Sequence, residues 1–397
     1  MCTPQYSRRR RGGRIAFVSC TMLLLGCLFV LSGCGLTPSR RPTVTLPGPL
    51  PTPTPGPSQP VILQDIHMLD EQNGWAVTKD KHILHTTSGA ATWREAMPRT
   101  GNITYTPGTY NFLDVQNAWV AMQTGDKFSI FRTYNGGGFW LETPLLDAGN
   151  GVSQISFADA QNGWLLFDKK SGAEGQAVDI FHTNDGGNSW LLISNVDSKT
   201  GDLRGALPFV GRKTGISFHS SAIGWVTGSV TDSKHPLLYM TSDGGFSWEP
   251  QTLSLPAGAS GTITTFAPKF SSAKDGILPV TFSANGNKVV FYSTQDGGKT
   301  WSAGPATTEV GTTLSFASDN QAWAIGSNGE NVYATSDSGR SWKQLAKPAA
   351  TARKLLNIDF LSATQGWVLA DMDDTTSLFQ VTGDGKSWTR LNTTASA

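Results

Sequence analysis

An aspartate followed by two glycines recurs along the chain, in a motif where a carboxylate could do chemistry. In HTNDGGNSW (182–190), Asp185 precedes Gly-Gly and Trp190 closes the motif. A carboxylate held in a turn could bind a cation, or could take part in glycosidic bond cleavage. One copy cannot separate such a site from a structural turn, so the number of copies decides.

The motif occurs seven times, and two of the copies have lost the acid. Ser88 replaces it in TTSGAATW and Asn135 replaces it in TYNGGGFW. A turn tolerates such replacements, whereas a metal ligand or a catalytic acid does not. We therefore interpret the motif as structural and expect no catalytic residue and no metal site in it. The acid and tryptophan pairs of the other copies are Asp185 and Trp190, Asp243 and Trp248, Asp296 and Trp301, Asp337 and Trp342, and, in a shortened copy, Asp384 and Trp388.

A second tryptophan motif, mostly Gly-Trp or Ala-Trp, precedes each copy of the first. It places Trp75, Trp119, Trp164, Trp225, Trp323 and Trp367, with Ile277 in the slot of the fifth unit, so that every one of the 13 tryptophans fills a repeat position. In the absence of disulfides, we expect these indoles to pack between repeats and to supply much of the stability.

Each repeat reads as four short strands, as in VSQISF, GWLLF, AVDIFHT and SWLLIS of the third unit. Repeats of this length with four strands are typical of propeller blades. The sequence therefore predicts an all-β fold, a seven-bladed β-propeller of four-stranded antiparallel blades over 61–397. The predicted blades are 61–98, 99–146, 147–196, 197–255, 256–308, 309–350 and 351–397.

Two family resemblances follow from these motifs. The pattern S/T-x-D-x-G-x-S/T-W resembles the Asp-box of bacterial neuraminidase repeats. Its combination with a Gly-Trp strand in seven copies resembles the photosystem II stability and assembly factor family over nearly all of 61–397. That resemblance implies a non-catalytic scaffold or assembly factor, without a cofactor, that handles a membrane-protein partner. No other feature of the sequence points to photosynthesis.

The N-terminal residues resemble the signal of a bacterial lipoprotein. Residues 1–33 hold five arginines and no acid, and an apolar run ends at Leu31-Ser32-Gly33-Cys34. This lipobox-like end implies cleavage before Cys34, lipid attachment to that cysteine, and an exported protein anchored at the extracytoplasmic face of the cell membrane. A spanning helix and a second lipobox at Cys27 are the alternatives. Nine of residues 35–60 are proline, which predicts an extended stalk over 34–60.

Composition limits the partners of the exported domain. The other three cysteines precede Cys34, so none is left to form a disulfide. Five of the 31 basic residues also precede it, which leaves a net charge of about −4. This charge argues against nucleic acid. We expect a monomer that contacts the bilayer through Cys34 and binds an envelope or membrane protein, or else a glycan.

A sialidase-like or other carbohydrate-active glycosidase is the alternative function. Sialidases clamp their substrate with three arginines, but Arg94 and Arg340 belong to the repeated hairpins, and Arg132 occupies an ordinary repeat position. The densest acidic segment, Asp371 to Asp374, reads as a solvated loop, with calcium binding left open.

Binding residues are predicted on the face opposite the repeated turns, because the length variation falls there. The long insertions are 97–110, 168–179, 195–214 and 249–262. The candidate partner-binding residues in them are Tyr105, Tyr110, Arg204, Phe209, Arg212 and Lys213. The alternative is that these are ordinary solvated loops.

Overall fold

The structure is a computed structural model, and its described part is built from strands alone. The described residues are 59–98, 106–125, 127–145, 149–201, 203–231, 235–257, 259–283, 288–318, 320–345, 353–372 and 375–396. All belong to the second of two compact units of the chain, Thr54–Ala397. None of their segments is a helix long and apolar enough to cross a membrane.

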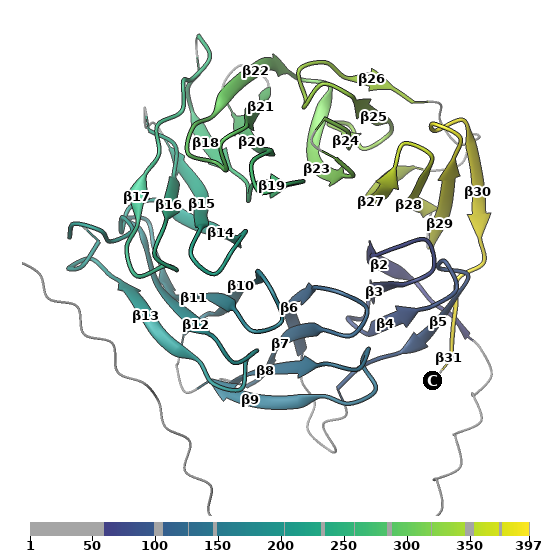
Figure 1. Cartoon of the computed structure of the whole chain (residues 1–397), viewed down its shortest axis with the longest axis horizontal. Coiled ribbons are helices and arrows are strands. Elements are labelled where there is room, and N and C mark those ends of the chain that lie inside the picture. The colour runs from purple at the N-terminus through teal and green to yellow at the C-terminus, as the bar shows by residue number, and fades with distance from the viewer. Residues whose placement is uncertain are drawn as a thin grey trace, which may run out of the picture. The chain divides into compact units, whose positions relative to one another are not determined.

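Seven antiparallel blades surround a common centre, so the predicted all-β, seven-bladed propeller is confirmed (Figure 1). The first four blades are β2 (Leu63–Met68), β3 (Gly74–Thr78), β4 (Ile83–Thr86) and β5 (Thr92–Glu95); β6 (Thr106–Phe112), β7 (Ala118–Thr124), β8 (Lys127–Thr133) and β9 (Leu141–Leu145); β10 (Gly151–Phe157), β11 (Gly163–Ser171), β12 (Gln176–Thr183) and β13 (Leu191–Val196); and β14 (Arg212–Phe218), β15 (Gly224–Thr231), β16 (Leu238–Thr241) and β17 (Glu249–Pro250).

The other three blades follow the same order from the centre outward. They are β19 (Lys269–Phe270), β20 (Gly276–Phe282), β21 (Lys288–Thr294) and β22 (Ser302–Thr307), with β18 (Thr262–Thr265) beside them; β23 (Val310–Phe316), β24 (Ala322–Gly326), β25 (Val332–Thr335) and β26 (Lys343–Gln344); and β27 (Lys354–Ser362), β28 (Gln365–Met372), β29 (Thr375–Thr382) and β30 (Ser387–Leu391). In every blade the tryptophan of the Gly-Trp motif, or Ile277, lies in the second strand.

Each second strand is buried on both of its faces, which explains its nearly continuous apolar sequence. In β3, β7 and β11 the first five residues are all buried. A strand in the middle of a blade has neighbours on both edges, and the flanking blades cover both faces, so every position favours an apolar side chain.

The hydrophobic core is divided into seven clusters, each lying between two consecutive blades, the seventh and first included. Trp164 stacks on Phe218 of the next blade with ring centroids 3.5 Å apart and the planes 1° from parallel. Trp119 stacks on Phe157 in the same way. Because the seven clusters form an unbroken series, the ring of blades is closed by side-chain packing.

Both ends of the described chain meet on the outer edge of the first blade. β31 (Thr394–Ser396) pairs in parallel with β5, and the two residues of β1 (Gln59–Pro60) pair with β31. The first blade thus gains a C-terminal strand, and this strand links the last part of the chain to the first.

The fourth and fifth blades share one continuous sheet of nine strands, which the repeat pattern does not predict. β18 pairs with the end of β15 on one edge and with β20 on the other. It begins at Thr262, the last residue of the predicted 249–262 insertion, so the bridging strand directly follows this variable loop.

Candidate functional site

The Asp-box hairpins are closed by hydrogen bonds within each motif. Asp185 accepts hydrogen bonds from the hydroxyl of Thr183 (2.7 Å), from the amide of Ser189 (3.0 Å) and from its hydroxyl (2.7 Å). Thr183 in turn accepts one from the amide of Gly187 (2.9 Å). The boxes of Asp243, Asp296 and Asp337 repeat the same bonds.

These bonds hold the box carboxylates in their ionised form. The hydroxyl and the amide of Thr300 lower the pKa of Asp296 to about 2, against a smaller opposing effect of burial. Gly186 and Gly187 adopt φ of 73° and 92°, which a side chain would strain. A saturated carboxylate has little capacity left for a substrate, so the geometry suits a structural turn.

The box aspartate bonds to the residue four positions later, not two positions later as is usual for aspartate in a turn. The two-residue pattern occurs instead in the turn before the Gly-Trp strand. There Asp70 accepts bonds from the amides of Gln72 and Asn73, both at 2.7 Å. Asp114 and Asp159 repeat this arrangement.

The tryptophans of the two motifs are buried to different extents. The six in the second strands are at most 4% exposed. Among the box tryptophans, Trp93 and Trp248 are as deeply buried, but Trp190, Trp301 and Trp342 are only partly buried. Trp190 meets the edge of Phe157, the ring on which Trp119 stacks. Both motifs therefore contribute to the contacts between blades, and the Gly-Trp motif buries more.

Lys213, a predicted partner-binding residue, is 1% exposed. Its ammonium donates to the carbonyls of Phe209 (2.9 Å), Gly211 (3.3 Å), Val210 (3.4 Å) and Gln176 (3.4 Å). Burial lowers its pKa to about 8. A buried Lys213 ammonium is incompatible with direct contact to a partner. Its hydrogen bonds to backbone carbonyls stabilise the 195–214 loop instead.

The other candidates fall in different places. Arg204 and Arg212 are exposed, Phe209 is partly buried, and all three lie in or next to the 195–214 loop. Tyr110 lies on β6 near the centre of the ring, where its hydroxyl donates to Asp65 of the first blade. Tyr105 and Cys34 lie outside the described residues, as do Asp373 and Asp374 of the acidic segment.

Two hollows flank Val210 on the face of the long loops. One, of about 490 Å³, is lined by Tyr239 and His235 together with the prolines Pro208, Pro236 and Pro250. The other, of about 370 Å³, is lined by the 171–176 hairpin and by Arg212. Val210 borders both and is 60% exposed. It is an apolar ridge between the third and fourth blades.

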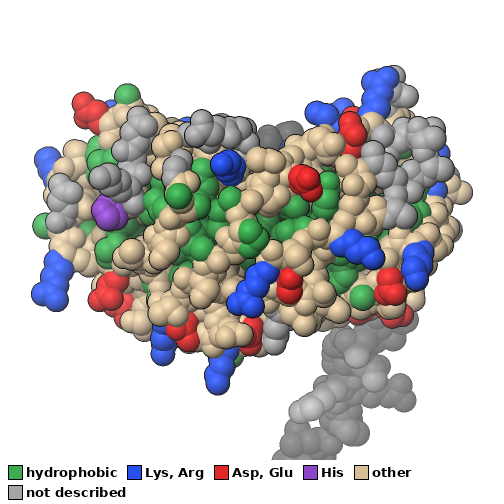
Figure 2. Space-filling view, turned by 90° about the horizontal axis from the view of Figure 1, so that it is seen from above, with side chains coloured by type: hydrophobic (Ala, Val, Ile, Leu, Met, Phe, Trp, Pro, Cys, Tyr) green, Lys and Arg blue, Asp and Glu red, His purple; other side chains and the backbone are tan. Residues whose placement is uncertain are grey.

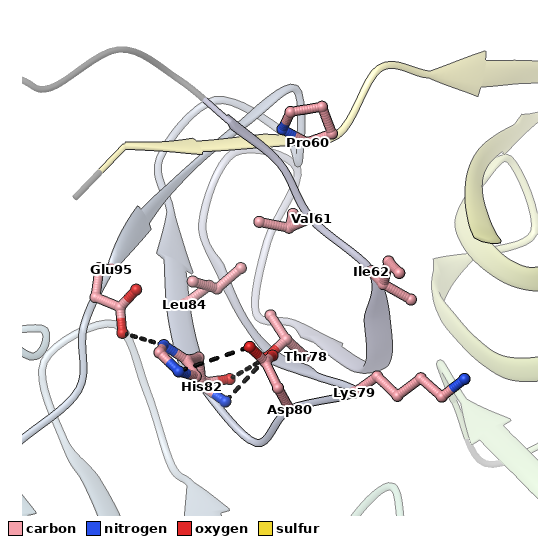
Figure 3. Close-up of a pocket in the computed structure, with 9 residues that line it drawn as sticks. All are labelled: Pro60, Val61, Ile62, Thr78, Lys79, Asp80, His82, Leu84 and Glu95. Atoms are coloured by element: carbon pink, nitrogen blue, oxygen red, sulfur yellow. Dashed lines mark hydrogen bonds and ion pairs between the residues drawn. The ribbon is translucent and has the colours of Figure 1, made fainter. Parts of the chain in front are cut away.

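A further hollow, of about 530 Å³, lies beside the start of the domain (Figure 3). Val61 and Ile62 border one side, and His82 contacts Glu95 (2.7 Å) and Asp80 (3.7 Å) on the other. Asp80 also accepts a bond from the Thr78 hydroxyl. These charged groups are all at least one-third exposed, so their pairing contributes little to stability.

A ring of seven polar residues, here called the inner ring, surrounds the centre of the propeller. Each lies on the innermost strand of its blade, opposite the Gly-Trp tryptophan or Ile277. In blade order the inner ring is His67, Asn111, Ser156, Ser217, Lys269, Ser315 and Asp359. The sequence carries a signal that motif reading missed: in every unit a polar residue directly precedes Phe, or Met in the first.

Inner-ring side chains bond across to the next blade. Ser156 accepts a bond from the amide of Phe218 (3.1 Å), and Ser315 accepts one from Phe360 (2.8 Å). Asp359 accepts one from the amide of Met68, which joins the seventh blade to the first. Only the first, fifth and seventh blades place titratable groups in the ring.

Two carboxyl groups lie together where the last blade meets the first. Burial, with a smaller contribution from the nearby Asp65, raises the pKa of Asp359 to about 7, and the Met68 amide and Lys269 oppose the rise. Burial also raises the pKa of Asp65, which accepts bonds from Tyr110 and Asn357. No set of three potential ligands suited to a metal ion occurs in the described part of the chain.

Comparison with known proteins supports the propeller fold and identifies proteins that are similar to this chain. A family model described as photosynthesis system II assembly factor YCF48 matches residues 280–378. The structure of YCF48 bound to a D1 peptide has a TM-score of 0.55 at 17% identity, over 82% of this chain and 96% of that chain. YCF48 from Cyanidioschyzon merolae has a TM-score of 0.51 at 17% identity, over 82% and 97%.

Enzymes share the fold as well. The GH74 xyloglucanase from Xanthomonas campestris has a TM-score of 0.57 at 13% identity, over 86% of this chain and 56% of that chain. A search of curated proteins found no match. At these identities the structural likeness shows the fold alone. The matched family model adds that the chain is similar to the assembly-factor propellers.

Proposed function

We propose that this protein is a non-catalytic, membrane-anchored scaffold that binds an extended segment of an envelope or membrane protein. The observation that carries the proposal is the ridge of Val210 between two hollows on the long-loop face. A partner segment crossing the third and fourth blades would place apolar side chains in the proline- and tyrosine-lined hollow. Glu174 and Arg212 of the other hollow would meet its polar groups.

Two further observations support a protein partner. The likeness to YCF48 includes a structure in which that protein holds a D1 peptide, so a propeller of this fold is able to present a peptide-binding surface. Charges of both signs are scattered over the side of the propeller visible in Figure 2, which does not resemble the basic surface of a nucleic-acid-binding protein.

The anchor is part of the same proposal. Lipid on Cys34 would hold the propeller at the extracytoplasmic face, and the proline-rich stalk would set its distance from the membrane. Cys34→Ser should move the protein from the membrane fraction to the soluble fraction. Continued recovery of the variant with membranes would contradict lipid anchoring without affecting the binding surface.

Substitution of the ridge tests the binding surface. Val210→Asp introduces a charge between the hollows and should reduce recovery of a protein partner from envelope extract at least tenfold. Leu191→Asp is the matched control, because Leu191 is 62% exposed and borders none of the hollows described here. Equal recovery of the partner with both variants would show that the long-loop surface is not used.

Among the described residues, the glycosidase alternative would rest on the carboxyl pair of Asp65 and Asp359. A raised pKa on one of two carboxyl groups is typical of a general acid. Both groups already accept hydrogen bonds from neighbouring blades, which suits a structural pair. Glycan turnover that Asp359→Asn abolishes would overturn the non-catalytic assignment.

A further inference from the structure

A hollow of about 250 Å³ lies beside the inner ring, and four consecutive blades contribute to its wall. Its polar side chains come from the innermost strands of the third to sixth blades, which face the centre of the propeller (Figure 1). They are Gln154 of β10, Thr214 of β14, Lys269 of β19 and Thr312 of β23. At about 30 Å³ for each water, the hollow has room for a small ion together with several waters.

The Lys269 ammonium is the charged group of this wall. Lys269 is exposed, and the structure gives its ammonium no ion pair and no hydrogen bond to another described residue. No described aspartate or glutamate lines the hollow. Asp65 and Asp359, whose raised pKa values Lys269 opposes, belong to the first and seventh blades and do not line it. The hollow therefore combines one cation with uncharged groups.

Hydroxyl and amide donors make up the rest of the polar wall. The hydroxyls of Thr214 and Thr312 have no hydrogen-bond partner in the described part of the chain. The Oε1 of Gln154 accepts a bond from the amide of Ile216 (2.9 Å), which fixes the carboxamide between the third and fourth blades. Its two N–H donors have no acceptor among the described residues. Each of these three side chains is thus able to donate to a ligand.

A buried hydroxyl in the same wall is also unsatisfied. Thr227 lines the hollow, is 1% exposed, and its hydroxyl has no hydrogen-bond partner in the part of the chain that the structure describes. A Cβ added to Gly215 would come within 2.2 Å of that oxygen, so the glycine provides the space that the hydroxyl occupies. A buried donor without a partner costs free energy, which a ligand oxygen is able to offset.

We infer that this hollow binds a small tetrahedral oxyanion of the phosphate and sulfate class. The Lys269 ammonium would form a charge-assisted hydrogen bond to it, and the hydroxyls of Thr214 and Thr312 would donate to its other oxygens. A tetrahedral ion presents oxygens in four directions, which suits donors that come from four blades. The hollow shares no lining residue with the two hollows that flank Val210, so this inference and the proposed partner surface are able to fail separately.

Anion titrations test the chemical class. Titration calorimetry of the full chain in detergent, at constant ionic strength, would measure binding of phosphate, sulfate, acetate and chloride. Phosphate or sulfate should bind saturably, at least tenfold more tightly than acetate or chloride. Glycerol 3-phosphate decides whether the free ion or a phosphate ester is the preferred form. Absence of saturable heat from phosphate and sulfate up to about 10 mM, or equally tight binding of acetate, would overturn the inference.

Matched variants test the place of binding. Lys269→Met should weaken binding of the preferred oxyanion at least tenfold, whereas Lys274→Met should not change it, because Lys274 is an exposed lysine of the same blade outside the hollow. Thr312→Val should weaken binding at least threefold, and its exposed neighbour outside the hollow supplies the control, Thr313→Val.

Calorimetry is the readout because phosphate and sulfate also stabilise proteins without binding to a site. Thermal melting in chloride would first confirm that each variant is folded. Equal affinity in Lys269→Met and Lys274→Met, or an equal loss in Thr312→Val and Thr313→Val, would overturn the assignment to this hollow.

Discussion

Asp359 shows how one residue departs from a repeated role. At the equivalent position Ser156 and Ser315 accept an amide bond from the next blade, and Asp359 does the same with a carboxyl group. The substitution places a titratable group at the junction between the last blade and the first. A serine there would perform the structural task without any dependence on pH.

Stability should fall as Asp359 ionises. Burial raises its pKa from 3.8 to about 7 in the folded protein, so the folded state binds the proton more tightly than the unfolded state. The stabilising contribution is complete below about pH 3.8 and is lost as the pH rises through 7. Urea melts from pH 4 to 8 should show that Asp359→Asn loses less stability over this range than the wild type.

The comparison with the variant isolates one group from the others that titrate. Lys269, Asp65 and Ser315 all act on the pKa of Asp359, and the substitution leaves them in place. If wild type and variant lost stability in parallel across the range, the carboxyl group would not be the pH-sensitive element.

At the scale of elements, the contact between blades is the repeated unit of stability. The second-strand tryptophan of one blade stacks on an aromatic residue at or near the end of the first strand of the next, as Trp164 does on Phe218 and Trp323 on Phe360. The indole of Trp164 also donates to the carbonyl of Gly244 in the next Asp-box (2.8 Å). Trp119 makes the same bond to Gly186, so the two repeated motifs meet where the second, third and fourth blades adjoin.

Replacement of Trp164 should cost more than replacement of Trp190. Trp164 is fully buried, so Trp164→Ala should lower the free energy of unfolding by about 3–5 kcal/mol. Trp190 is only partly buried, and Trp190→Ala should cost at least about 1 kcal/mol less. Denaturant melts of both variants would measure the difference, and the reverse order would contradict the assigned roles.

The repeat motifs predicted the blades because each motif contains residues that a hairpin or a contact between blades needs at a fixed place in the sequence. Gly187 supplies a positive φ, and Trp164 needs a surface on which to stack, so spacing alone identified hairpins and blades. Insertions carry no such repeat. The burial of Lys213 depends on carbonyls from two separate segments, and the bridging role of β18 depends on two neighbouring blades. Neither has a signal in the local sequence.

The candidate-site residues were predictable to the same extent, that is, only where a local sequence signal exists. Arg212 lies at the surface as predicted from its loop, and its contact with a partner stays a prediction. The inner ring was missed because His67, Lys269 and Asp359 are single substitutions at a position where other blades have serine or asparagine. Their shared position becomes visible only when the seven repeats are aligned on one another.

At the scale of the whole molecule, the C-terminal strand adds a backbone link to the side-chain packing that closes the ring. β31 pairs with β5 and with β1, and Ala395 packs against the cluster between the seventh and first blades. A chain ending at Asn392 should lose about 1–3 kcal/mol of unfolding free energy. Thr394→Ala and Ser396→Ala are the controls and should be near wild type, because the pairing uses backbone groups. A truncated chain as stable as the full one would show that packing alone closes the ring.

The bridging strand β18 gives the propeller an internal asymmetry. Elsewhere, neighbouring blades meet mainly through side chains, whereas the fourth and fifth are also joined by a backbone ladder through β18. Amide protons of β15 and β20 should consequently exchange with solvent as one slow block, and a thermal fluctuation that parts two sheets should avoid this boundary. Of the seven similar blades, the fourth and fifth should therefore fluctuate as a single unit.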